Sequence, residues 1–416
     1  MKILVLGSGA REHAIVKALI RTGSVASNVI CAPGNAGIAQ DVACVPLNAN
    51  DPASVVAFAT AEKIGLVIIG PEAPLVAGVS DALRAAGIPV FGPSQRAAQL
   101  EGSKSFAKEI MAAADVPTGM AHECSTIEEV ESALDDFGAP YVVKADGLAA
   151  GKGVIVTSDR EAALEHARKF IGMGILVEEF LAGQEVSLFF LADGHNVMPL
   201  TPAQDFKRAY DHDEGPNTGG MGAYSPLPWL PAGFVEEVQR TVAQPTIDEL
   251  ARLGEPFVGL LYCGLIVTER GIRVIEFNAR FGDPETQVVL RRLLTPLAGL
   301  LHSAATGNLE TAPDPRFSDE VAITVVLASE GYPDKAAPNR PIHGLHHAAA
   351  VAGVEICHAA TAQDGDHLIA IGGRVLSVVA VGKTFHHARE HAYEAIGHIK
   401  LDGAHFRTDI AKKVAN

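Results

Sequence analysis

The first hundred residues alternate strand and helix signals, and this alternation constrains the fold more than any other feature of the chain. The predicted strands are 3–6, 29–31, 66–69 and 89–91. A strand–helix–strand order produces a parallel sheet with crossover helices. Ligands bind at the carboxyl ends of such strands. The loops that the sequence places there are 7–11, 33–37 and 70–75.

Composition describes an ordinary globular protein with a sizeable core. The chain has 416 residues, of which 48% are hydrophobic and 20% charged, so about two to four domains are expected. The formal net charge of −16 argues against a general nucleic-acid or anionic-membrane binder. Five cysteines without paired metal spacing fit a reducing cytoplasm. No apolar run is long enough for a transmembrane helix.

Changes in pattern divide the chain into three parts. Residues 1–102 form the predicted parallel-sheet domain, 103–319 a central region that contains an α+β unit at about 118–190, and 320–416 a separate α+β domain. Ser103 is predicted to cap a helix that runs to about residue 114. A second helix is expected to begin with a capping box, Ser158 to Glu161.

Three polar side chains follow an apolar, β-branched run near residue 275. Glu276, Asn278 and Arg280 occupy positions i, i+2 and i+4, which point to one face of a strand. A carboxylate and a carboxamide oxygen suit Mg²⁺, which also takes phosphate and water oxygens. A guanidinium neutralises charge on a transferring phosphoryl group. The pattern predicts a metal–phosphate site, and the alternative is an edge strand with a solvated polar face.

A strand–glycine loop–strand occupies residues 142–156. Its three glycines, Gly147, Gly151 and Gly153, allow backbone N–H groups to approach a phosphate closely. Lys144 and Lys152 add positive charge. The spacing is not that of a Walker P-loop, which requires four residues between the glycines and a following helix. The alternative is a flexible hairpin turn.

Three further segments are candidates for binding. Residues 178–185 follow a strand, where backbone groups can pair with an adenine edge and Glu185 can accept from ribose hydroxyls. The glycine-rich loop 215–226 is costly to order unless it binds something. The loop Gly7–Glu12 resembles a dinucleotide fingerprint, but Glu12 replaces its third glycine. That loop is therefore interpreted as a phosphate or sugar loop, with Arg11 as an anion contact.

Taken together, these segments resemble the ATP-grasp ligases, and within them the glycinamide ribonucleotide synthetase family. The resemblance covers nearly the whole chain. The matching segments are GSGAREHA (7–14), APGNAG (32–37), GPEAPLVAGV (70–79), QLEGSK (99–104), KADGLAAGKGV (144–154), GPNTGGMGAYSP (215–226), IEFNARFGDPE (275–285), HGL (343–345) and GGRVLSV (372–378). The resemblance implies an α/β protein with α+β parts. An ATP-grasp fold would lie between an N-terminal parallel-sheet βαβ domain and a C-terminal α+β domain, with 118–190 as a mobile lid.

The resemblance also implies a reaction and its participants. Members join 5-phosphoribosylamine to glycine in purine biosynthesis, using ATP with Mg²⁺ or Mn²⁺, by way of an acyl phosphate of glycine. The expected partners are these small molecules and not nucleic acid or membranes, and a cytoplasmic monomer is expected. Such a reaction requires alignment and charge neutralisation more than proton transfer by side chains.

Residue roles carry over at the matching positions. Glu276 and Asn278 become the metal ligands, and Arg280, Lys144 and Asp205 the catalytic groups. The ATP contacts implied are Lys104, Lys144, Gly151, Lys152, Gly153, Glu178, Glu179, Phe180, Leu181 and Glu185. The substrate contacts implied are Gly9, Arg11, Asn35, Glu72, Asp205, Lys207, Gly219, Gly220 and Met221.

The sequence departs from the family pattern in the strand 262–267, which lacks the carboxylate that many ATP-grasp enzymes offer there. A metal at Glu276 and Asn278 would then depend more on phosphates and water. Three other functions stay open at this point. They are another ATP-grasp carboxylate–amine ligase or carboxylase of ribonucleotide metabolism, a nucleotide-binding regulatory protein without turnover, and a dehydrogenase based on Gly7–Glu12.

Overall fold

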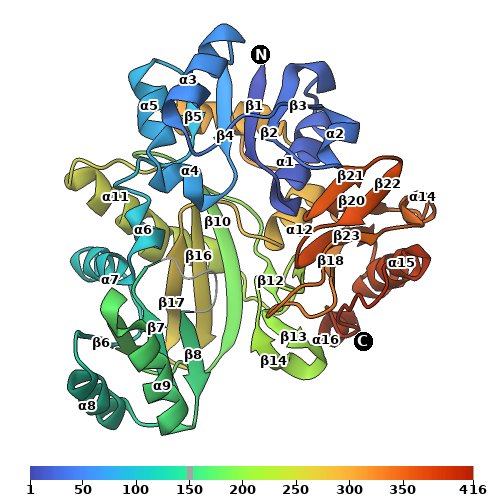
Figure 1. Ribbon diagram of the computed structural model, residues 1–416. Coiled ribbons are helices and arrows are strands. Elements are labelled where there is room, and N and C mark those ends of the chain that lie inside the picture. The colour runs from blue at the N-terminus through green and yellow to red at the C-terminus, as the bar shows by residue number, and fades with distance from the viewer. Residues whose placement is uncertain (148–152, 416) are drawn as a thin grey trace.

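Five parallel strands from the first 91 residues form the sheet at one end of the molecule, in a computed structural model that describes residues 1–147 and 153–415 (Figure 1). In spatial order they are β3 (Ala43–Cys44), β2 (Val29–Pro33), β1 (Ile3–Gly7), β4 (Leu66–Ile69) and β5 (Val90–Phe91). The helices among them are α1 (Ala10–Arg21), α2 (Ile38–Asp41), α3 (Pro52–Ala61), α4 (Glu72–Val76) and α5 (Val79–Ala85). The predicted parallel βαβ arrangement is confirmed.

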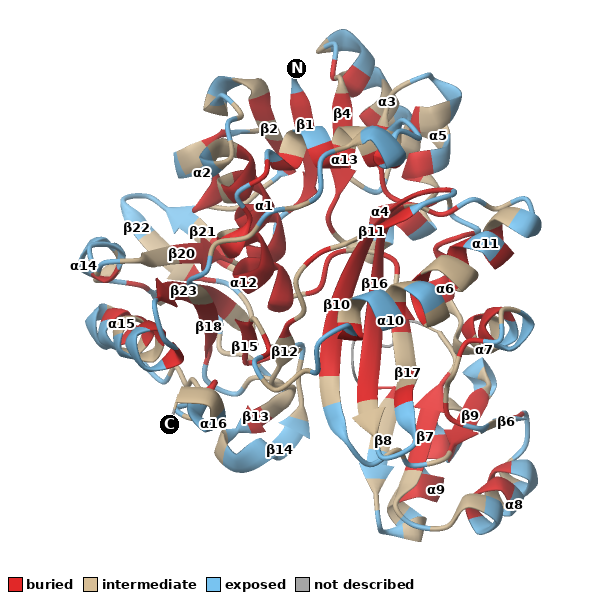
Figure 2. Ribbon diagram, turned by 180° about the vertical axis from the view of Figure 1, so that it is seen from behind, coloured by how far each residue is buried: buried red, intermediate tan, exposed pale blue. Residues whose placement is uncertain are grey.

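The centre of the molecule is an antiparallel sheet built from long strands. Its order is β11 (Val197–Pro199), β10 (Gln184–Asp193), β16 (Val258–Thr268) and β17 (Gly271–Asn278). Strands β10 and β16 are buried along most of their length (Figure 2). Five helices lie beside this sheet. They are α6 (Gln99–Gly102), α7 (Lys104–Ala113), α10 (Phe234–Val238), α11 (Gln244–Arg252) and α13 (Leu297–Ala305).

A smaller antiparallel sheet with its own apolar core projects beside β17. Its order is β6 (Ala121–Cys124), β9 (Ile175–Glu178), β7 (Tyr141–Ala145) and β8 (Val154–Thr157), with helices α8 (Ile127–Phe137) and α9 (Arg160–Phe170) packed on it. Helix α9 begins one residue later than predicted, because Asp159 accepts from the N–H groups of Glu161 and Ala162. The predicted Ser158 capping box was therefore wrong. Strand β10 pairs with β16, so residues 184–190 belong to the central sheet.

The C-terminal part of the chain supplies three strands of a five-stranded antiparallel sheet, and the middle of the chain supplies the other two. Its order is β12 (Gln204–Asp205), β15 (Gly222–Ser225), β18 (Val321–Ala328), β23 (Arg374–Gly382) and β20 (Val354–His358). Helices α12 (Glu285–Arg292) and α15 (Phe385–His398) pack against it. The smaller elements are β13 (Arg208–Tyr210), β14 (Glu214–Asn217), β19 (Arg340–Pro341), α14 (Leu345–Ala349), β21 (Thr361–Asp364), β22 (His367–Ala370) and α16 (Lys412–Ala415). Because β12 and β15 join this sheet, residues 204–225 link the central and C-terminal parts.

Across the two described ranges, the helices are all too short or too polar to cross a bilayer.

Candidate active site

A β-bulge sets the direction of the polar residues on β17. Gly264 of β16 pairs with Glu276, whereas its neighbour Leu265 pairs with Val274, so Ile275 is the extra residue. Ile272 and Val274 are buried before the bulge, and Phe277 and Ala279 are buried after it. The bulge thus shifts the phase of the alternation. Glu276 and Asn278 therefore share the face opposite the core.

Gly264 gives Glu276 the space that it occupies. A Cβ atom at Gly264 would lie 3.0 Å from Cγ of Glu276 and 3.2 Å from its backbone oxygen. A side chain there would push the carboxylate from its place. The glycine opposite the bulge is therefore part of the site.

Arg280 lies beyond the end of β17 and is oriented by two carboxylates from other elements. Its Nη2 is 2.8 Å from Oε1 of Glu101, and its Nε is 3.7 Å from Oε2 of Glu72. Burial opposes its charge, but Glu101 and Glu72 outweigh that effect and raise the pKa of Arg280. The expectation that all three polar residues belong to one strand was wrong for Arg280, because the strand ends at Asn278.

Four cationic side chains surround Glu276. Burial alone would raise the pKa of Glu276, but the positive charges of Lys207, Lys144, Lys104 and Arg280 lower it. The carboxylate is therefore ionised at neutral pH. The fold brings these groups together from α7, β7, the segment after β12 and the end of β17.

Lys144 is buried at the junction of the small sheet and β17. Its Nζ donates to Oε2 of Glu178 over 2.9 Å and to the backbone oxygen of Ile275 over 3.2 Å. Lys108, on α7, lies 3.5 Å from the same Glu178 oxygen. The pair of lysines holds Glu178 on the inner side of the small sheet.

The start of α7 is joined to the glycine loop. Ser103 caps the helix by accepting from Phe106 N–H, as predicted. Asp146 accepts from the backbone N–H of Lys104 over 2.5 Å, and Nζ of Lys104 donates to the Gly147 oxygen over 3.0 Å. Burial lowers the pKa of Lys104, although Glu276 opposes the shift. Gly151 and Lys152 lie outside the described residues, while Gly153 closes the loop by accepting from Ala145 N–H.

The segment that connects the small and central sheets carries the predicted adenine contacts. Glu179 is tied to Met120, whose N–H it accepts over 3.2 Å, and lies 3.4 Å from Arg270. The Phe180 side chain is 44% exposed, and Leu181 is half-buried beside Gly119. An exposed apolar side chain provides a surface on which a planar ring can pack.

Glu185, a predicted ATP contact, is paired with Lys207, a predicted substrate contact. Their side chains form an ion pair of 2.8 Å. The negative charges of Asp205, Glu185 and Glu276 also act on Lys207. Burial opposes the charge of Lys207, but these carboxylates raise its pKa well above the usual value. Asp205 has its own pKa raised to about 7 by burial and by the nearby Glu285 and Glu185, against the effect of Lys207.

A buried hydrogen-bonded cluster lies next to Asp205. Glu285, the first residue of α12, accepts from the Tyr262 hydroxyl over 2.9 Å and from Ser187 over 3.2 Å. Burial, then the charges of Glu285 and Asp205, raise the pKa of Tyr262. Residues 262–267 of strand β16 contain no carboxylate, but Glu285 of α12 places its carboxylate against Tyr262 of that strand.

The glycine-rich loop is held by residues from both sides. Arg374 donates to the Gly219 oxygen over 2.6 Å and to the Asp283 oxygen over 2.9 Å, and it pairs with the Asp283 carboxylate at 3.1 Å. Gly220 has φ +110°, and a Cβ there would lie 2.4 Å from Pro284. The Met221 side chain is fully buried.

The N-terminal loop is filled by its own acidic residue. Oε2 of Glu12 accepts from the Gly9 N–H over 2.6 Å, and Oε1 accepts from Arg11 over 2.6 Å. Glu12 also lies against Gly7 and Gly70. It occupies the place that a dinucleotide pyrophosphate needs, which disfavours the dehydrogenase interpretation. Arg11 reaches the Phe281 oxygen over 3.1 Å.

Asn35 connects the N-terminal loop to the C-terminal sheet. Its Nδ2 donates to the backbone oxygens of Ser8 and His358, each over 2.8 Å, and its Oδ1 accepts from the N–H groups of Gly37 and Ile38, each over 2.9 Å. The amide group is therefore committed to internal bonds. It shapes the loop whose backbone borders the site.

The donor set on β17 fits a hard divalent cation. Glu276 is ionised, and within residues 1–147 and 153–415 the side-chain oxygens of Glu276 and Asn278 accept no hydrogen bond. The same ranges contain no group of three or more His, Cys, Asp or Glu residues able to hold a metal. A two-ligand site of this kind needs phosphate and water oxygens to complete its coordination.

Sequence reasoning omitted several residues of this region. Glu101, Asp283 and Glu285 all lie in motifs that the resemblance used, QLEGSK and FGDPE, so their positions carried a signal. Asp146 likewise lies in a matching motif, KADGLAAGKGV. Tyr262 carried no such signal, because none of the matching motifs contains it and its partners Ser187 and Glu285 are distant in sequence.

Comparison with known proteins agrees with this architecture along the whole chain. Residues 1–101, 102–286 and 322–413 match the N, ATP-grasp (A) and C domains of phosphoribosylglycinamide synthetase. The phosphoribosylamine–glycine ligase of Leifsonia xyli subsp. xyli is 64% identical, over 99% of this chain and all of its own length. That of Streptomyces coelicolor is 58% identical over the full length of both.

A solved structure shows the same arrangement. The crystal structure of phosphoribosylamine–glycine ligase from Thermotoga maritima superposes with a TM-score of 0.85 at 31% identity, covering 99% of this chain and all of that one. Sequence and structure agree over the same full length. The chain belongs to the phosphoribosylglycinamide synthetase family.

Proposed function

We propose that this chain joins glycine to 5-phosphoribosylamine, with ATP as the energy source. The observation that carries the proposal is the gathering of Lys104, Lys144, Lys207 and Arg280 around the ionised Glu276 in a member of this family. Such an arrangement stabilises negative charge on a transferring phosphoryl group without a covalent enzyme intermediate. The products are glycinamide ribonucleotide, ADP and phosphate, within purine biosynthesis.

The ATP side of the site is assigned to the two sheets that meet at Lys144. Lys104 and Lys144, with the backbone of the glycine loop, would contact the phosphates. Gly151 and Lys152 belong to the same assignment by sequence. Adenine and ribose would lie along Glu178–Leu181, with Glu185 at the ribose hydroxyls, where Phe180 offers an exposed apolar surface.

Glu276 and Asn278 would hold Mg²⁺ or Mn²⁺, and the bound cation would neutralise negative charge on the phosphates. Arg280 lies just beyond these two residues and would neutralise the charge of the transferred phosphoryl group. The glycine carboxylate attacks the γ-phosphorus, ADP leaves, and the amine of phosphoribosylamine then attacks the acyl carbon and expels phosphate. The side chains orient these partners and do not form bonds to them.

The substrate side is assigned to the loops opposite the ATP side. Asp205 and Lys207 are near enough to Glu276 for its charge to affect their pKa values, and they would orient the amine that attacks. Gly219, Gly220, Gly9 and the loop that Asn35 shapes would border the substrates, with their backbone groups held by internal hydrogen bonds. Arg11 and Glu72 border the same region. We assign Met221 only a backbone role, since its side chain is buried.

We further propose that the chain acts as a cytoplasmic monomer with 1–102, 103–319 and 320–416 as its working units. The family matches, which end at residues 101 and 286 and resume at 322, support this division. Sedimentation at working concentration tests the monomer, and a dimer there would contradict it.

The test of the reaction is ADP release with ATP, Mg²⁺, glycine and freshly generated phosphoribosylamine, each omitted in turn. We expect turnover to collapse when either glycine or the amine is left out. ADP release that does not depend on them would reject the substrates, and bicarbonate-dependent turnover would favour a carboxylase. Replacing Mg²⁺ by Mn²⁺ in the same assay decides between the two cations.

A further inference from the structure

The geometry points to Glu101 as the residue that positions Arg280, and we propose this role for it. Glu101 is the third residue of α6 and lies far from Arg280 in sequence. Its carboxylate makes two contacts with consecutive residues of the other segment. Oε1 is 2.8 Å from Nη2 of Arg280, and Oε2 accepts the backbone N–H of Ala279 over 2.8 Å. The inference rests on the phosphoryl-transfer role proposed above for Arg280.

The two contacts fix both the side chain and its backbone. Binding to Ala279 N–H anchors the chain where β17 ends, one residue after Asn278. Binding to Nη2 then aims the guanidinium. The Glu101 side chain is only 7% exposed, so water competes little for either contact and the pair is held more firmly than a surface ion pair.

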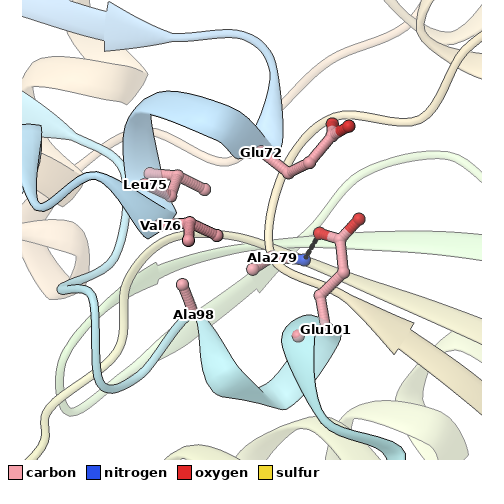
Figure 3. A pocket seen from close by; sticks show the side chains of 7 residues that line it. Glu72, Leu75, Val76, Ala98, Glu101 and Ala279 are labelled. Atoms are coloured by element: carbon pink, nitrogen blue, oxygen red, sulfur yellow. Dashed lines mark hydrogen bonds between the residues drawn. The ribbon is translucent and has the colours of Figure 1, made fainter. Parts of the chain in front are cut away.

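The surroundings confine Glu101 to this position. Figure 3 shows a small pocket in which Leu75, Val76 and Ala98 form an apolar side, while the carboxylates of Glu72 and Glu101 both point away from that side. Burial raises the pKa of Glu101, whereas Arg280 and the Ala279 N–H oppose that shift. Without Arg280 this carboxylate would be buried without a counter-charge, so the two residues depend on each other.

Glu72 does not fix the Arg280 guanidinium in the same way. Its oxygen is 3.7 Å from Nε of Arg280, too far for a hydrogen bond, and Nε is buried without a partner in the described part of the chain. Among residues 1–147 and 153–415, the hydrogen bond of Arg280 Nη1 is to the neighbouring Phe281 oxygen, over 3.2 Å. Glu101 is therefore the group that determines where the guanidinium lies.

The segment around Glu101 also reaches the phosphate side of the site. Ser103 and Lys104 follow Glu101 by two and three residues, and Lys104 contacts Asp146 and Gly147 of the glycine loop. One short segment thus places Arg280 and a phosphate-binding lysine relative to each other. Errors of about 1 Å in such alignment can cost about 100-fold in rate.

The decisive variant is Glu101→Gln. Its side-chain oxygen can still accept from Ala279 N–H, but its amide presents a donor to the Arg280 guanidinium and loses the ion pair. We expect kcat of the complete ligase reaction to fall by about 10- to 100-fold, with KM for ATP within about twofold of wild type, since the adenine and phosphate contacts lie elsewhere. Glu62→Gln, in the surface pair with Lys2, is the matched control and keeps wild-type kinetics.

A double-mutant cycle separates positioning from a merely structural role. In an Arg280→Ala background, Glu101→Gln should change kcat by less than about twofold, because the group that it positions is gone. Thermal unfolding of each variant monitors the fold, and Glu101→Asp, which keeps the charge one methylene shorter, should recover part of the lost rate. An equal fall in both backgrounds, or a Glu101→Gln protein with wild-type kcat, would overturn the inference.

The outcomes distinguish this inference from the proposal on which it rests. If Arg280→Ala keeps wild-type ADP release, the proposed role of Arg280 fails and Glu101 loses its function with it. If Arg280→Ala is inactive while Glu101→Gln is fully active, only the positioning role is rejected.

Discussion

Replacing His358 by phenylalanine should remove a specific acid sensitivity from this protein. His358 ends β20 and is 5% exposed. Its ring lies against the backbone of Gly37 and its Nδ1 is 3.1 Å from the Thr361 hydroxyl. Burial, followed by the positive charges of His13 and Lys17, lowers its pKa to about 3. The folded protein therefore keeps this ring neutral at pH values where the unfolded chain protonates it.

The magnitude follows from the two pKa values. The unfolded ring titrates at about 6.5, so below that pH the unfolded state binds one proton more than the folded state. Stability is then lost as the pH falls, by about 1.4 kcal/mol for each pH unit. Between pH 7 and pH 5 the loss from His358 is about 2 kcal/mol, and it continues until the folded pKa is reached.

The pH dependence of wild-type stability does not by itself reveal the contribution of His358. Asp205 has its pKa raised to about 7, so it binds a proton in the folded state first and stabilises the fold as the pH falls over the same range. Because Asp205 is present in both proteins, the difference between wild type and His358→Phe isolates the histidine. We expect the His358→Phe substitution to cost some stability at pH 7, through the lost Thr361 contact, and the variant to gain about 2 kcal/mol relative to wild type on going to pH 5.

The assay is urea unfolding at pH 7 and pH 5, followed by fluorescence of Trp229. It is the only tryptophan of the chain, and its indole donates to Tyr224 of β15, which pairs with β18 in the sheet that contains β20. The fluorescence therefore reports on the sheet that His358 serves. A wild-type minus variant difference that changes by less than about 0.5 kcal/mol between the two pH values would refute the reasoning.

Three other changes test the site. Gly264→Ala places a Cβ 3.0 Å from Cγ of Glu276, so kcat should fall at least about 10-fold with a stability cost of about 1–3 kcal/mol, measured by ADP release and thermal unfolding; unchanged kcat would contradict this. Asn35→Ala removes four internal hydrogen bonds and should lower the unfolding free energy by about 2–4 kcal/mol, and a loss below about 0.5 kcal/mol would argue against that anchoring role. Asp205→Asn should abolish an inflection near pH 7 in the pH profile of kcat/KM, and its persistence would assign that titration to another group.

Local chemistry made much of the fold predictable. The four predicted strands of the N-terminal sheet were located within two residues at each end, because apolar runs act over a few neighbours. Ser103 capped its helix as predicted. At residue 158 the same local logic failed, since the adjacent Asp159 is the residue whose carboxylate reaches two free N–H groups.

The sequence by itself determined the type of site. The spacing of Glu276 and Asn278, the glycine loops and the flanking lysines predicted a metal–phosphate site, since alternation on a strand and the freedom of glycine are properties of short segments. The resemblance of the motifs pointed to the family that the comparisons show. Arg280 was predicted as part of a strand that in fact ends two residues earlier.

Only the tertiary structure decided how those groups are held. The bulge at Ile275 depends on how β17 aligns with β16, and the same alignment places Gly264 opposite Glu276. The contact of Glu101 with Arg280 depends on the packing of α6 against the end of β17. Register and charge pairing between distant segments arise only when their surfaces are packed together, because the energies involved are absent until water is excluded from both.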